Sequence, residues 1–310
     1  MHRWSTDTYK SVSSSLYEDD PIWQLKMPEV AFKHDFLLNG IFAMAAFDMA
    51  RSCRTEYARY ISAAFEYQDL AFRGFRAQFD EQLSDSYEAT LYFSILLLPL
   101  DLASSQWMTP GGTLDSWIHH TAIQFELLRG VAMVLASRSG VVSDHPLFGK
   151  TRKISDLPRV PLETSTELAL GKLFELNERR SSPNHSQSSR NQDNARAYTG
   201  CRKALSWLSE CFATCLQEPY HAYCLQWIAY AGDDFFAAVK RRDRVALLIL
   251  AYWGILIELL GLEYWWARTF GRCLIKEISD ALLDDSDETI RGILTWAQHE
   301  VDRIPGKQLR

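Results

Sequence analysis

Two adjacent aspartates in the second half of the sequence have the residue types and spacing of a metal-dependent site. Asp233 and Asp234 precede two phenylalanines, and paired carboxylates of this kind can hold the magnesium ions that bind a diphosphate group. That interpretation makes Asp233 and Asp234 catalytic residues, magnesium a cofactor and terpenoids the substrates. The alternative is that Gly232 and the two acids begin a helix, where carboxylates face the positive end of the helix dipole. We favour the helix start, and so expect no metal and no cofactor.

The other acidic and histidine residues are weaker candidates for a metal site. His119 and His120 are adjacent, so their side chains point to different faces of a helix and cannot share a metal as a pair four residues apart could. An acidic cluster falls between two expected helices, where its carboxylates serve the next helix start and stay solvated; its members are Asp284, Asp285, Asp287 and Glu288.

The six cysteines do not form a zinc-binding pattern. No two of them are separated by two residues, the spacing that recurs in structural zinc sites. Cys211 and Cys215 lie four apart on an expected helix, which places both thiols on one face. We expect the cysteines to be small buried residues in a reducing compartment.

Aromatic residues are abundant, with 10 Trp, 13 Tyr and 16 Phe, and they supply large apolar area with few rotatable bonds. Such side chains either fill a core or wall an apolar ligand pocket. The candidate ligand-binding residues of this type are Phe93, Trp227, Trp253, Tyr264 and Trp265. The sequence has no Gly-rich phosphate loop, nucleophile elbow or metalloprotease histidine pair.

These residues must be positioned by helices, because helical periodicity runs along the whole chain and no alternating strand pattern bounded by hairpin turns is present. We expect an all-α fold, an irregular multi-helix bundle or α-solenoid of about ten helices, as a single domain over residues 1–310. Pro99 is expected to bend or end its helix. Residues 178–196 are too polar to offset ordering entropy and are expected to form a disordered surface loop. The predicted helices cover residues 28–49, 55–79, 84–98, 114–137, 198–217, 233–240, 244–260, 264–283 and 287–303.

Composition and charge argue against two further classes of protein. The chain has 310 residues, 47% of them hydrophobic, which is enough for a sizeable core. Its formal net charge of -6 leaves no basic excess to neutralise phosphates, so we expect no direct nucleic-acid binding. The longest apolar run, 246–262, includes Glu258 and is shorter than the roughly 20 apolar residues that span a membrane. With no secretory signal apparent, we expect a protein of the nucleus or the cytoplasm.

Five segments are informative together because of their order and intervals, although each consists mostly of common helix-forming residues. The most distinctive are HDFLLNGIFAMAAFDMA at 34–50, LLRGV at 127–131 and WWARTFGR at 265–272, and the other two are 4–12 and 227–252. The chain thereby resembles the regulatory domain that follows the binuclear zinc cluster of fungal-specific transcription factors. Asp35, Asn39 and Asp48 stand where the family pattern has a proline and two histidines.

The resemblance implies an all-α effector domain, most similar to that of the sterol-uptake regulators, which binds a sterol and controls nuclear entry and transcription. It implies a small apolar, sterol- or terpenoid-like ligand, a homodimer or a partner regulator, and a DNA-binding zinc cluster that this chain lacks. No residue here inherits a sterol contact, because the sterol-pocket residues lie outside the five segments. The alternative is an enzyme of fungal secondary metabolism on the same scaffold, a terpenoid cyclase or isomerase that uses Asp233, Asp234 and an aromatic cavity.

Overall fold

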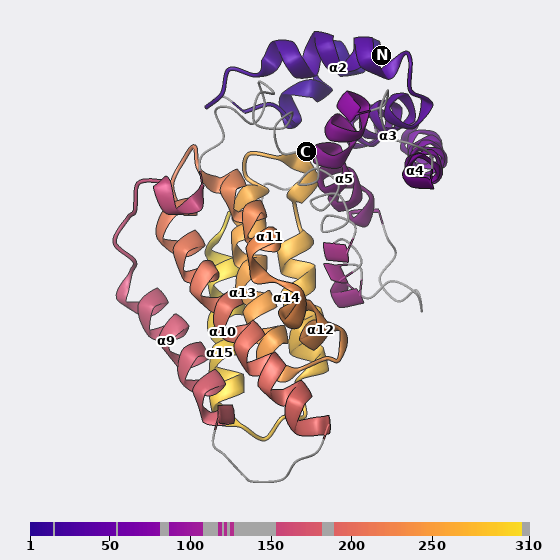
Figure 1. Cartoon of the computed structure of the whole chain (residues 1–310). Coiled ribbons are helices and arrows are strands. Elements are labelled where there is room, and N and C mark those ends of the chain that lie inside the picture. The colour runs from indigo at the N-terminus through magenta and orange to yellow at the C-terminus, as the bar shows by residue number, and fades with distance from the viewer. Residues whose placement is uncertain are drawn as a thin grey trace.

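The computed structural model is all-α, as predicted. It describes residues 1–14, 16–53, 55–80, 87–107, 117–119, 121–122, 125–126, 153–181 and 189–305, and no strand occurs in these ranges. Figure 1 shows the helices gathered in two parts. The N-terminal part contains α1 (His2–Thr6), α2 (Met27–Ala31), α3 (Asp35–Ser52), α4 (Tyr57–Asp80) and α5 (Tyr87–Ser105). The C-terminal part contains α9 (Thr164–Glu178), α10 (Ser189–Cys215), α11 (Trp227–Ala231), α12 (Asp233–Lys240), α13 (Arg244–Leu260), α14 (Phe270–Ala281) and α15 (Glu288–Arg303).

Helix α3 is the centre of the N-terminal part and packs against α4 and α5. We predicted one helix over 28–49, and this is wrong, because the chain breaks at residues 32–34 between α2 and α3. His34 has extended backbone dihedrals, Phe32 is 67% exposed, and Asp35 opens a new helix with its acid at the positive end. The apolar spacing continues across the break, which is why periodicity alone did not reveal it.

Helix α5 runs through Pro99 and continues to Ser105, so it does not end at the proline. A proline in a helix interior removes one backbone hydrogen bond. Here Pro99 and its neighbours Leu96, Leu97, Leu98 and Leu100 are buried, and their packing stabilises the helix on both sides of the lost bond.

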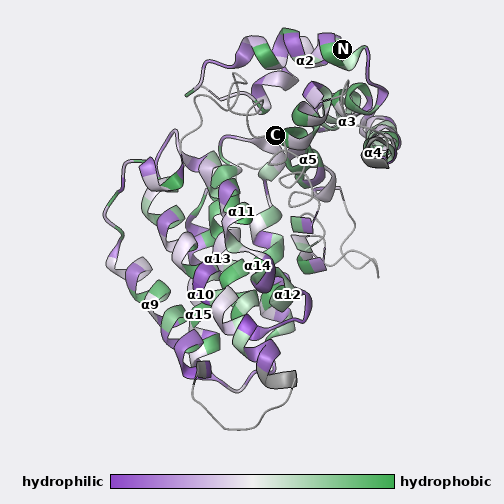
Figure 2. Cartoon of the chain, viewed as in Figure 1, coloured by the Kyte–Doolittle hydropathy of each residue, from purple (hydrophilic) through white to green (hydrophobic). Residues whose placement is uncertain are grey.

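Helix α13 is the centre of the C-terminal part, where it contacts α9, α10, α12, α14 and α15. Figure 2 shows hydrophobic residues along α13, whereas hydrophilic residues are frequent on the outer helix α9. The helix begins where Asp243 accepts hydrogen bonds from the backbone amides of Val245 and Ala246, each at 3.1 Å. The predicted bounds of α12 and α13 are confirmed, and the prediction for α15 differs by one residue at its start.

Two further predictions are corrected by the structure. The predicted helix 264–283 is a 3₁₀ turn, η6 (Trp265–Ala267), followed by α14, and Thr269 separates them with a φ of 63°. The predicted loop 178–196 is largely helical, because Ser189 already belongs to α10 and only 182–188 lie outside the described residues. Residues 192–196 belong to the first turns of α10 and are exposed. The helix is stabilised by packing of the buried face that begins at Ala197, and these residues extend it. Most of the predicted helix 114–137 also lies outside the described residues.

The two parts meet at the loop between α13 and α14. The side-chain amide of Gln106 donates to the carbonyl of Trp265 at 2.9 Å, and the Trp266 indole donates to the carbonyl of Ser11. The Tyr264 hydroxyl reaches the carbonyl of Ser13 at 3.5 Å. Residues from the start of the chain and from the end of α5 therefore hold the same loop. Among the described helices, none is long and apolar enough to cross a membrane.

Candidate functional site

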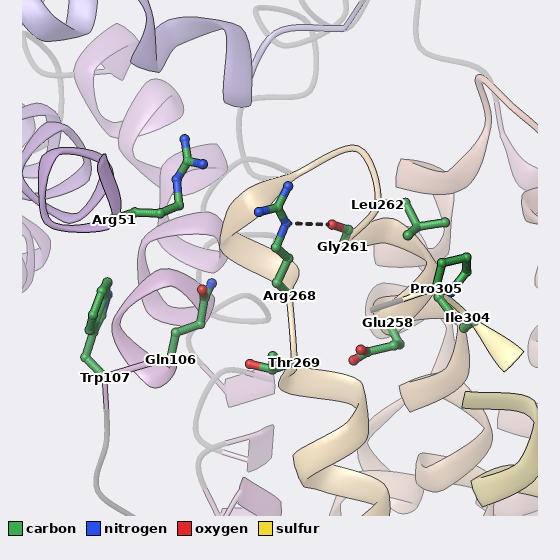
Figure 3. A pocket seen from close by; sticks show the side chains of 10 residues that line it. All are labelled: Arg51, Gln106, Trp107, Glu258, Gly261, Leu262, Arg268, Thr269, Ile304 and Pro305. Atoms are coloured by element: carbon green, nitrogen blue, oxygen red, sulfur yellow. Dashed lines mark hydrogen bonds between the residues drawn. The ribbon is translucent and has the colours of Figure 1, made fainter. Parts of the chain in front are cut away.

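A pocket of about 210 Å³ lies where the two parts meet (Figure 3). The N-terminal part supplies Arg51, at the end of α3, and Gln106 and Trp107, which follow α5. The C-terminal part supplies the remaining lining residues, which are Glu258, Gly261, Leu262, Arg268, Thr269, Ile304 and Pro305. Because both parts build its walls, a ligand in this pocket would contact both.

The loop after α13 turns back so that Arg268 reaches the pocket. A Cβ at Gly261 would lie 3.0 Å from the Arg268 Cα, so the close approach of the two ends of the loop favours glycine there. The Arg268 Nε donates to the Gly261 carbonyl at 3.2 Å, the contact drawn in Figure 3. Thr269, in the left-handed region, then directs the chain into α14.

Arg51 is held in place by contacts of its own. Its Nη2 donates to the Asp48 carboxylate at 2.9 Å, and its guanidinium lies 5.5 Å from the centre of the Trp265 ring. Asp48 is buried and also accepts from the Arg3 Nε at 2.7 Å and from the Thr8 hydroxyl at 3.0 Å. Arg51 is thus held in place directly by residues of α3 and η6, and Asp48 is in turn held by Arg3 of α1.

Arg268 carries a charge that no carboxylate balances in the described part of the chain. It forms no ion pair there, and the one hydrogen bond of its side chain goes to a backbone carbonyl. Burial, and after it the positive charge of Arg51, lowers the pKa of Arg268 from its ordinary value. An arginine remains protonated in proteins nonetheless, so the two guanidinium groups make this side of the pocket electropositive.

Glu258 is the one acid among the lining residues, and it is committed to another partner. Its carboxylate is buried and accepts from the Arg272 backbone amide at 3.1 Å, with the Arg272 Nε at 3.5 Å. Burial raises the pKa of Glu258, and the contacts with Arg272 offset this only in part. The carboxylate therefore serves the first turn of α14 instead of neutralising Arg268.

The aromatic residues predicted to bind a ligand do not come together in one pocket. Trp227 and Trp253 stack at 5.6 Å inside the C-terminal part, whereas Phe93 contacts Phe36 and Phe75 inside the N-terminal part. Tyr264 and Trp265 lie in the loop between α13 and α14, and Trp265 reaches the pocket only through Arg51. In the described residues these five side chains serve core packing and the junction of the two parts.

Asp233 and Asp234 begin α12, as the helix-start interpretation predicted, and both are exposed. They line a surface depression of about 230 Å³, which is more open than the junction pocket and lies beside the Lys240–Glu126 ion pair. The enzyme interpretation needs these carboxylates to face a closed apolar cavity, and this depression is open to solvent. Within the described ranges, no three histidine, cysteine or acidic residues are grouped as metal ligands.

Sequence reasoning missed the residues that line the pocket, above all Arg51 and Arg268. A signal for both was present, because Arg268 lies inside the distinctive segment 265–272 and Arg51 directly follows the segment 34–50. A lone arginine beside apolar and aromatic residues needs either a counter-charge or a ligand, but its neighbours in space cannot be deduced from spacing along the chain.

Comparisons of this chain with known protein families, with curated proteins and with solved structures find no match. The function is therefore argued from the pocket and from the sequence segments that surround it.

Proposed function

We propose that this chain is a ligand-sensing regulatory domain of transcription, of the type that its five sequence segments resemble. One of the segments lines the pocket, because segment 265–272 contains Arg268 and Thr269. Segment 34–50 ends one residue before the lining residue Arg51, and segment 227–252 ends on α13, the helix that carries the lining residue Glu258. The position of these segments at and beside the pocket is the observation that carries the proposal. Segment 127–131 lies outside the described residues.

The position of the pocket supports a sensing role. A ligand that contacts both parts of the molecule favours the arrangement in which they are joined, and such differential binding is what couples a ligand to a conformational response. Partners or DNA-binding modules that recognise only the joined arrangement would then respond to the ligand. With a net charge of -6, the chain itself is unsuited to bind DNA, so the proposal includes a DNA-binding module on a partner or on another segment, and action in the nucleus.

The size of the pocket limits the ligand. Sites for drug-sized molecules occupy roughly 300–1,000 Å³, and a sterol falls in that class, whereas this pocket holds about 210 Å³. The proposal therefore keeps the regulatory role and a homodimer or partner regulator, and replaces the expected sterol- or terpenoid-like ligand with a smaller one.

A tethered reporter assay tests the regulatory role. The chain is fused to an unrelated DNA-binding domain, and transcription from a reporter is compared with that of the DNA-binding domain alone. We expect a change in output, in either direction, and a further change with Arg268→Gln, within the roughly 5- to 150-fold range typical of coupling between sites. Arg73→Gln, on the exposed side of α4, is the matched control. A stable, nuclear fusion whose output equals that of the DNA-binding domain alone would contradict the proposal.

A further inference from the structure

The electrostatics of the junction pocket are unbalanced. Arg51 shares Asp48 with Arg3, and Arg268 has no carboxylate partner within the described residues. Two guanidinium groups on one side of a half-buried pocket repel each other, and that repulsion is stronger than it would be in open water. A bound negative charge between them would remove the repulsion.

Two of the lining residues also carry buried hydrogen-bond donors that lack acceptors in the described structure. The Arg51 Nε and the Trp107 Nε1 are both buried, and neither has a hydrogen-bond partner in the described structure. Buried polar groups in native proteins are nearly always paired, so each unpaired one asks for an explanation. Both atoms can only donate, but each is covered by the protein, so a ligand in the pocket would reach them only if a neighbouring side chain moved.

The remaining lining residues define the rest of the ligand. The Gln106 side-chain amide already donates to the Trp265 carbonyl, and the Glu258 carboxylate already accepts from the Arg272 backbone amide. In Figure 3, Glu258 lies on the far side of Arg268 from Arg51, away from the paired guanidinium groups. Leu262, Ile304 and Pro305 add apolar surface at the same end as Glu258. The pocket thus has a cationic, donor-rich end and a more apolar end.

We infer that this pocket binds a small organic anion, with a carboxylate or phosphate group held by Arg51 and Arg268 and a compact apolar body toward Leu262 and Ile304. Guanidinium groups match the acceptor geometry of both oxyanions. The inference names the ligand class of the proposed sensor and so rests on that proposed function for its biological meaning, although binding itself can be measured separately.

Isothermal titration calorimetry on the full chain tests the inference with four probes at constant ionic strength: inorganic phosphate, phenyl phosphate, benzoate and neutral benzyl alcohol. We expect saturable binding of at least one anion, no binding of benzyl alcohol, and weaker binding as salt increases. Binding of phenyl phosphate with no binding of benzoate assigns a phosphate ligand, and the reverse assigns a carboxylate. Absence of saturable binding by all three anions at millimolar concentration overturns the inference.

Paired variants test whether the binding occurs in this pocket. Arg268→Gln removes the unpaired charge and should weaken anion binding about tenfold or more. Arg268→Lys keeps the charge but loses the paired N–H donors of the guanidinium group, so its affinity for the anion should lie between those of Arg268→Gln and the unchanged chain. Glu258→Gln removes the one acid from the lining and should strengthen binding. Arg73→Gln should leave it unchanged, because Arg73 is exposed on α4 and pairs with Asp69. Circular dichroism and thermal unfolding verify that each variant is folded, and equal affinity in folded Arg268→Gln and the unchanged chain would overturn the assignment.

The two proposals fail in distinguishable ways. Anion binding that depends on Arg268, combined with a reporter output equal to that of the DNA-binding domain alone, would retain the anion site and reject the regulatory role. A reporter response combined with no anion binding would retain the regulatory role and reject the anion as its ligand.

Discussion

At the scale of single residues, Asp48 shows how one side chain both holds the fold and prepares the pocket. Its carboxylate accepts from Arg3, Thr8 and Arg51. This one negative charge is shared by two arginines, and one of them, Arg51, lines the pocket.

Asp48→Asn should lower the free energy of unfolding by about 2–3 kcal/mol at pH 7, because hydrogen bonds to charged groups are worth about 1.5–3 kcal/mol and two arginines lose their counter-charge. Urea denaturation measures this difference. Asp69→Asn, which removes an exposed ion pair with Arg73 on α4, is the control and should change little. If both variants lower the free energy of unfolding by the same small amount, Asp48 contributes no more to stability than an exposed ion pair does.

The contribution of Asp48 should also depend on pH. Burial by itself raises the pKa of Asp48, but the hydrogen bonds from Arg3 and Arg51 outweigh it, and the net pKa lies below its ordinary value. A carboxyl group with a lowered pKa in the folded state stabilises the protein above its unfolded-state pKa, near 4, and this stabilisation is lost as pH falls through the lowered value. The stability difference between the unchanged chain and Asp48→Asn should therefore shrink below about pH 4, as urea denaturation at pH 3 and pH 7 would show.

The sequence predicted the position of a residue well where that position depends on its neighbours in the chain. The helix starts at Asp233 and near Asp287 follow from carboxylates at the positive ends of helices, a relation between neighbours in sequence. Arg51 and Arg268 were not predicted as a pair because 216 positions separate them along the chain, and only the packing of the two parts brings them into one pocket.

At the scale of elements, the backbones of α13 and α14 approach each other closely where the two helices cross. A Cβ at Gly271 would lie 2.0 Å from the carbonyl oxygen of Gly254 and 2.9 Å from the amide nitrogen of Glu258. Both obstacles are backbone atoms, which cannot move aside as a flexible side chain can. The crossing therefore requires glycine at this position, and it also sets where Glu258 and the first turn of α14 meet.

Gly271→Ala should destabilise the protein by about 3 kcal/mol or more, since overpacking against backbone displaces one helix from the other. The matched control is Gly292→Ala in α15, where a Cβ would meet no atom within 4 Å. That change should stabilise the protein by about 0.5–1 kcal/mol, because alanine is the better helix former. Chemical denaturation of the two variants tests the contrast, and a Gly271→Ala variant as stable as Gly292→Ala would contradict the crossing.

The start of α13 offers a second element-scale test. Asp243 caps the helix through two backbone amides and pairs with both terminal nitrogens of Arg180, which follows α9. Asp243→Ser keeps a capping oxygen but loses the ion pair, whereas Asp243→Ala loses both. Urea denaturation should rank Asp243→Ala below Asp243→Ser by about 1 kcal/mol, the usual value of a cap. Equal stabilities would mean that the cap contributes nothing measurable and that the ion pair accounts for the whole effect.

Helices were predicted reliably where a continuous apolar face ends at a polar residue, as for α12 and α13. The breaks at residues 32–34 and at Thr269 were missed because apolar spacing continues across both, and the loop before Thr269 is also held by tertiary contacts. The Trp266 indole, for example, bonds to the Ser11 carbonyl more than 250 positions away. Such a partner competes with helical continuation and leaves no local signal.

At the scale of the whole molecule, the first thirteen residues connect the two parts. Arg3 bonds to Asp48 in the N-terminal part, and the carbonyls of Ser11 and Ser13 accept from Trp266 and Tyr264 in the C-terminal part. The loop that carries Arg268 is therefore held from the far end of the chain. A perturbation on one side of this junction should be felt on the other.

Trp266→Phe tests this connection, because it keeps an aromatic ring and removes the indole donor to Ser11 together with part of the buried ring. We expect a loss of about 0.5–1.5 kcal/mol, the net worth of a typical hydrogen bond, and faster amide hydrogen exchange both in residues 1–13 and in the loop 261–269. Trp207→Phe is the control: Trp207 stacks on Tyr230 at 4.2 Å within the C-terminal part, so its effect on exchange should stay in that part. Hydrogen exchange read by mass spectrometry distinguishes the two cases. If exchange in residues 1–13 is unchanged in Trp266→Phe, the two parts are not coupled through this contact, and a ligand in the pocket would have to join them through Arg51 and Arg268 alone.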